Sequence, residues 1–147
     1  MTTSTEQIAG ETAALDLMLG YLAADPNAVA CALAAGSRCA ATADYMRRQA
    51  SGLLHDTVLA DPGFSPYSRA VMGRAGLAWL DSIPMDEAVK ETVLALADDG
   101  AAPRLALDDA QLTTVFALSA VARCVATYGK EATMERLDRI RALVNQP

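Results

Sequence analysis

Apolar residues recur along this chain at the three- and four-residue spacing that places them on one side of an α-helix. Between about residues 4 and 24, for example, Leu15, Met18 and Leu22 follow this spacing. No segment alternates apolar and polar residues as a half-buried strand does. The pattern predicts six to seven helices, at about residues 4–24, 26–35, 37–59, 66–81, 86–98, 109–127 and 131–144. We therefore predict a compact all-α bundle that forms one domain over residues 1–147.

The segment at 109–127 differs from the others because apolar residues surround most of its circumference. Only Arg123 is charged after its first turn. A helix that is apolar on all sides is usually buried, so we expect this one to be the central helix of the bundle. The segment at 26–35 consists almost entirely of small and apolar residues, and we expect it to be buried as well.

Residues that favour helix ends separate these segments. Serine and aspartate accept hydrogen bonds from the free N–H groups of a first turn, whereas glycine commonly follows the last turn. The predicted starts are at Ser4, Asp25, Ser37, Ser65, Asp86 and Asp108, and the predicted stops are at Gly36, Gly63, Gly100 and Gly129. These signals agree with the apolar spacing, which strengthens the helical prediction.

The composition is that of a folded domain with a core of small aliphatic side chains. Hydrophobic residues make up 52% of the chain, charged residues 20% and aromatic residues 5%. No signal peptide or uninterrupted apolar span is recognised, so we expect a cytoplasmic protein with no membrane contact. Alanine-rich helix faces would also allow a homodimer. Cys31, Cys39 and Cys124 are expected to be buried small side chains rather than disulfide or metal ligands.

Negative charge is concentrated in one part of the chain. The net charge is −6, and residues 81–109 hold eight acidic side chains against two basic ones. We take the following residues as a candidate surface for a basic protein partner: Asp86, Glu87, Glu91, Asp98 and Asp99. A nucleic-acid partner is not expected, because phosphate binding requires a basic surface.

Two glycines interrupt the helix predicted at 66–81. Gly73 and Gly76 lie three residues apart, and each weakens a helix by up to about 1 kcal/mol relative to alanine. Close approach of another helix would explain them. The alternative is a ligand groove in which bare backbone and Trp79 contact a small molecule.

The chain contains a single histidine, His55, in a distinctive setting. Paired arginines, Arg47 and Arg48, precede the stretch Leu54-His55-Asp56-Thr57-Val58. This stretch resembles the phosphoacceptor box of one class of bacterial sensor histidine kinases, in which a helical histidine accepts a phosphoryl group. The resemblance implies phosphotransfer through His55 as one alternative function. It is confined to residues 47–58, because a predicted turn at 61–63 breaks the helix that continues in that family.

A second alternative is a helix-turn-helix at residues 29–48. Ala32 and Gly36 have the spacing of the core of that motif, and Arg47 and Arg48 follow on the next helix. Thr42 occupies a position that usually carries a branched apolar residue. This pattern would make the protein a DNA-binding regulator.

No sequence motif for catalysis or cofactor binding is recognised. The chain has no glycine-rich phosphate loop, no G-x-S-x-G and no H-E-x-x-H. We therefore expect no metal, no cofactor and no enzymatic activity. The favoured hypothesis is a non-enzymatic interaction module, such as an inhibitor, an immunity-type protein or a regulatory adaptor.

Overall fold

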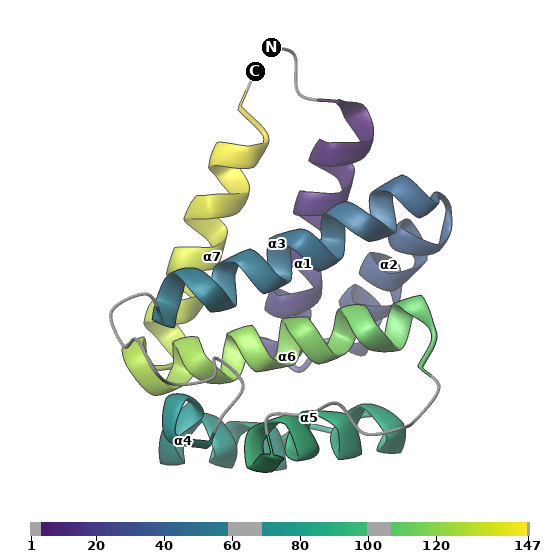
Figure 1. Cartoon of the computed structure of the whole chain (residues 1–147). Coiled ribbons are helices and arrows are strands. Elements are labelled where there is room, and N and C mark those ends of the chain that lie inside the picture. The colour runs from purple at the N-terminus through teal and green to yellow at the C-terminus, as the bar shows by residue number, and fades with distance from the viewer. Residues whose placement is uncertain (1–3, 59–68, 100–106, 147) are drawn as a thin grey trace.

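The computed structural model describes residues 4–58, 69–99 and 107–146, without the side chains of residues 54–58, 69–73 and 96–99. The described residues form seven helices and no strand, which confirms the all-α prediction (Figure 1). The helices are α1 (Thr5–Leu22), α2 (Pro26–Ser37), α3 (Ala40–Val58), α4 (Arg69–Ser82), α5 (Glu87–Asp99), α6 (Asp109–Tyr128) and α7 (Lys130–Val144).

Several of the predicted helix starts carry the expected hydrogen bonds. The Ser4 hydroxyl accepts from the backbone N–H of Gln7 at 3.1 Å, and Asp25 accepts from the first turn of α2. Asp108 and Gln111 cap α6 reciprocally, each side chain accepting from the other residue's backbone N–H. Among the predicted stops, Gly129 separates α6 from α7 with a positive φ of 85°. These ends were predictable because capping depends on neighbouring residues.

The predicted boundary at Gly36 and Ser37 is wrong. Helix α2 continues through both residues, and α3 begins at Ala40. Gly36 is buried, and a Cβ atom there would lie 2.7 Å from the Met46 sulfur. The glycine therefore permits close packing of α2 on α3 instead of ending a helix. The predicted signals at Gly63, Ser65 and Gly100 lie outside the described residues.

Helix α6 is the central helix, as predicted. It packs against α3 on one side and against α4 and α5 on the other, and it also contacts α1 and α7 (Figure 1). The side chains of Val115, Leu118 and Val121 are at most 1% exposed. Within the described residues α6 alone is long and apolar enough to cross a membrane, yet 61% of its most apolar window is buried inside the bundle.

The first and last helices bring the two ends of the chain together. Helices α1 and α7 lie side by side, and their outer ends point the same way (Figure 1). Arg141 donates to Asp16 at 2.6 Å, and Asn145 donates to Thr12 at 3.1 Å. These contacts join α1 to α7.

Helix α2 does not have the predicted burial. Of its residues only Ala32 and Gly36 are buried, whereas Ala30 and Cys31 are exposed, and Val29 is partly exposed. Helix α2 has no charged residue, so its apolar composition indicated a core position. It instead lies at the edge of the bundle and packs mainly on α1 and α3.

Candidate functional site

The acidic surface predicted from the sequence divides into residues with different roles. Asp86 precedes α5, and its carboxylate accepts from the backbone N–H groups of Ala88 at 2.9 Å and Val89 at 3.2 Å. It also accepts from the Gln111 side chain of α6 at 3.4 Å. Asp86 is therefore an N-cap of α5, although its side chain remains exposed.

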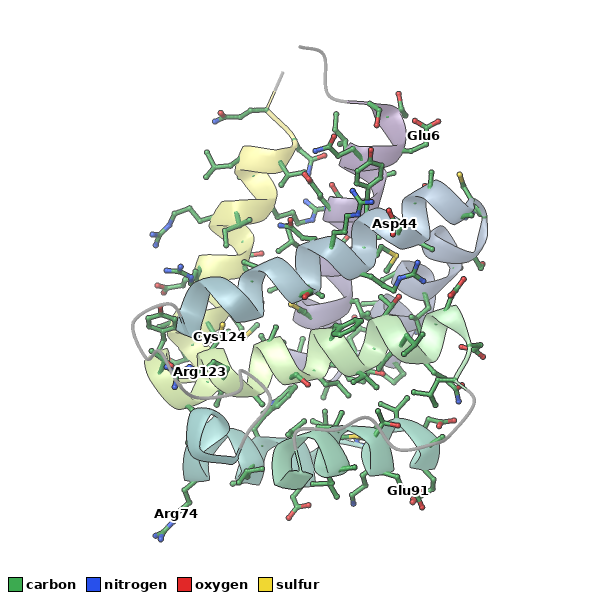
Figure 2. The ribbon with its side chains drawn as sticks, viewed as in Figure 1. Glu6, Asp44, Arg74, Glu91, Arg123 and Cys124 are labelled. Carbon is green, nitrogen blue, oxygen red and sulfur yellow. The ribbon has the colours of Figure 1, made fainter. Side chains whose placement is uncertain are left out.

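Glu87 and Glu91 are also exposed. They lie four residues apart on α5, so their side chains share one face of the helix. No cation among the described residues lies within ion-pair distance of either carboxylate. Figure 2 shows Glu91 on the side of α5 that faces away from α6. Asp98 and Asp99 belong to the last turn of α5, but their side chains lie outside the described part of the chain.

The charges around Glu87 and Glu91 are unbalanced. The described side chains of α4, α5 and the segment between them include four exposed carboxylates, those of Asp81, Asp86, Glu87 and Glu91. The cations among these side chains are Lys90 and Arg74. Figure 2 places Arg74 at the opposite end of this layer from Glu91. The Glu91 end of the layer is therefore acidic.

Acids on the other helices are frequently paired. Asp44 lies 2.9 Å from Arg48 and 3.6 Å from Arg47, and Asp109 lies 2.9 Å from Arg47. On α7, Glu131 and Glu135 are accompanied by basic side chains along the helix. Glu87 and Glu91 differ from these acids because the charged side chains around them are mostly negative.

Gly76, one of the two glycines of α4, has the structural role that close helix packing predicts. A Cβ atom at Gly76 would lie 2.3 Å from the carbonyl oxygen of Ala122, so the backbones of α4 and α6 are in contact there. This contact occupies the space at Gly76 that a ligand would need. Gly73 lies in α4, but its surroundings are outside the description. Trp79 is only 8% exposed and belongs to the core.

Trp79 also reaches an apolar groove on another side of the bundle. This groove has a volume of about 620 Å³ and lies between α2 and the segment that joins α4 to α5, with residues 20–22 of α1 also in its lining. We call it the α2 groove, and its main apolar lining residues are Tyr21, Val29, Leu33, Trp79, Ile83 and Met85. The sequence did not reveal it, since α2 was expected in the core. Two features of the sequence could have indicated it: the lack of charged residues in α2, and the apolar residues Ile83 and Met85 in a segment between helices.

The arginines of the predicted helix-turn-helix face acidic neighbours. Arg47 bridges Asp44 and Asp109, and Arg48 pairs with Asp44 and lies over the Tyr45 ring at 5.8 Å. Helix α3 packs along α1 and α6, burying Met46 and Ala50. These contacts offset the positive charge that binding to DNA phosphates requires.

The phosphotransfer alternative centres on His55, which lies in α3. Its side chain, like those of the neighbouring residues 54–58, is outside the described part of the chain. The structure therefore adds nothing to the resemblance through which His55 was singled out.

The cysteines are more varied than predicted. Cys124 is buried, and desolvation raises the pKa of its thiol. Cys31 and Cys39 are exposed, which corrects the expectation that all three are buried. Cys39 lies just before α3, where hydrogen bonds from the backbone N–H groups of Thr42 and Ala41 lower the pKa of its thiol. Among the described residues, no group of His, Cys, Asp and Glu has an arrangement suited to a metal ion.

Comparisons with known proteins do not place the chain in a family. No protein-family model, curated protein or solved structure matches it.

Proposed function

We propose that this protein is a non-enzymatic interaction module that binds the basic surface of another protein through α5. The observation that carries the proposal is the exposed pair Glu87 and Glu91, which lacks a cationic partner among the described residues. Like charges at this spacing destabilise a helix by a few tenths of a kcal/mol. Lysine or arginine side chains of a partner would relieve that repulsion and speed association.

The test is affinity capture from native extract, with the bound proteins identified by mass spectrometry. The wild-type protein is compared with the double variant Glu87→Lys/Glu91→Lys. We expect a basic protein that is retained by the wild type and lost with the variant. It should also be released at about 0.5 M salt, where charges more than a few ångströms apart are screened.

Helix α7 offers a matched control. Glu131 and Glu135 are exposed and four residues apart, and Glu131, like Glu87, lies in a first helical turn. The variant Glu131→Lys/Glu135→Lys therefore makes the same change in net charge at another place. It should retain more of the basic protein than Glu87→Lys/Glu91→Lys does. Equal loss with both variants, or no basic protein with the wild type, would contradict the proposal.

A further inference from the structure

The α2 groove combines half-buried apolar side chains with a helix that has no charge. Tyr21, Val29, Leu33, Ile83 and Met85 each pack on the core and remain partly exposed to solvent. A surface helix usually has charged residues on its outer side, but α2 has none between Pro26 and Ser37. An exposed apolar area of this kind is typical of a binding surface.

The charged side chains at the groove favour a basic occupant. Asp25 and Lys130 both contribute to its lining. Asp86 follows Met85 of the lining directly, and its carboxylate accepts from the Gln111 side chain of α6. Within the lining one carboxylate therefore balances one ammonium group, and the exposed Asp86 and Glu87 next to Met85 add negative charge beside the groove.

We propose that the α2 groove binds an amphipathic helix of the basic partner, with the apolar face of that helix against Val29, Ile83 and Met85. The lysine or arginine side chains of the bound helix lie beside Asp25 and Asp86. The inference rests on the proposed function. It identifies the α2 groove as the apolar part of the interface, which the acidic surface by itself does not provide. Binding energy in protein interfaces is concentrated in such apolar contacts, whereas surrounding charges contribute mainly to specificity and rate.

A helix suits the groove better than a small molecule does. Pockets for small molecules enclose most of the ligand surface. Here Tyr21, Val29 and Ile83 remain partly exposed to solvent, although Trp79 is nearly buried. Helix α2 lines the groove on one side, and the non-helical residues 83–85 line it on another. An apolar helix face against an open groove is a recurring mode of peptide recognition.

The tryptophan supplies a direct readout, because Trp79 is the only one in the chain and lines the groove. The probe is a synthetic amphipathic peptide of about four helical turns, with leucine on one face and lysine on the other. A second peptide has glutamate in place of every lysine. We expect the lysine peptide to change Trp79 emission and to saturate at one peptide per chain. The glutamate peptide should bind at least about tenfold more weakly, because the acidic surface repels its glutamate side chains.

Two substitutions test whether the peptide lies in the groove, because one should lower its affinity and the other should raise it. Ile83→Asp places a charge in the apolar wall and should weaken binding of the lysine peptide about tenfold or more. Lys130→Glu removes the cation of the lining and should strengthen binding severalfold. Lys130 is exposed in the first turn of α7, where an acidic side chain is favourable, so this variant is expected to fold. Circular dichroism checks that both variants remain helical.

Any of the following four outcomes would contradict the inference. If neither Ile83→Asp nor Lys130→Glu changes the affinity, the peptide does not occupy the groove. Equal binding of the two peptides would indicate an unspecific apolar site. A change in Trp79 emission with protein concentration alone would indicate that a second copy occupies the groove. If only Glu87→Lys/Glu91→Lys weakens the lysine peptide, the α2 groove is excluded and the acidic surface of α5 remains.

Discussion

At the scale of single residues, the glycines show how sharply a helix contact limits side-chain size. At Gly76 an added methyl group would overlap the Ala122 carbonyl oxygen. At Gly52 of α3, by contrast, the described part of the chain, apart from the nearby backbone of α3 itself, places no atom within 4 Å of an added methyl group. We expect Gly76→Ala to destabilise the protein by about 1–3 kcal/mol, because overpacking outweighs the better helix propensity of alanine. Gly52→Ala should stabilise it by about 0.5–1 kcal/mol. Urea unfolding followed by circular dichroism measures both, and equal effects would contradict the close contact of α4 and α6.

Cysteine reactivity is also decided at this scale. The N–H groups at the start of α3 stabilise the Cys39 thiolate, so its pKa lies below that of an ordinary thiol. Burial has the opposite effect on Cys124 and raises its pKa. We expect iodoacetamide to modify Cys39 well before Cys124 in the folded protein at neutral pH, and the rate at Cys39 to reach half its maximum at a lower pH than in urea. Peptide mass spectrometry after timed alkylation distinguishes the sites. If the pH of half-maximal alkylation at Cys39 were the same in urea as in the folded protein, α3 would not stabilise the thiolate.

At the scale of elements, Asp86 has two features that substitutions can distinguish: the hydrogen bonds that cap α5 and the negative charge at the surface. Its carboxylate caps α5, and asparagine can accept the same hydrogen bonds without the charge. Asp86→Ala should therefore lower the free energy of unfolding by about 1 kcal/mol, whereas Asp86→Asn should stay within a few tenths. Thermal unfolding gives both values. If the two variants are equally destabilised, the charge rather than the cap is what stabilises α5.

The same scale shows what the sequence predicts and where it falls short. The starts at Ser4, Asp25 and Asp108 were predictable because each cap involves residues two or three positions apart. The burial of α6 followed from its apolar circumference. The position of α2 did not follow, because an uncharged helix suits the core and an exposed binding surface equally well. The α2 groove was missed for the same reason, since Val29 and Ile83 meet only after the chain has folded.

At the scale of the whole molecule, α6 joins two unequal parts. On one side α1, α2, α3 and α7 pack on one another as well as on α6. On the other side α4 and α5 have few contacts with each other, and their packing against the described remainder runs mainly through α6 (Figure 1). Both proposed binding surfaces include residues of the less extensively packed side. The predicted single domain, residues 1–147, therefore has a part whose stability can differ from that of the rest.

This arrangement predicts that α5 opens before the bundle unfolds. Regions with few packing partners exchange their amide hydrogens through local opening that costs less than global unfolding. We expect amides of α5 to exchange with an opening free energy at least about 1–2 kcal/mol below that of α6 and α1. Val93 is 1% exposed on α5, and Val93→Ala should lower the opening free energy of α5 by roughly 2 kcal/mol through lost apolar burial, with little change in α1. Hydrogen exchange measured by mass spectrometry resolves these helices. Equal protection of α5 and α1, with Val93→Ala lowering both together, would show that the described helices unfold as one unit.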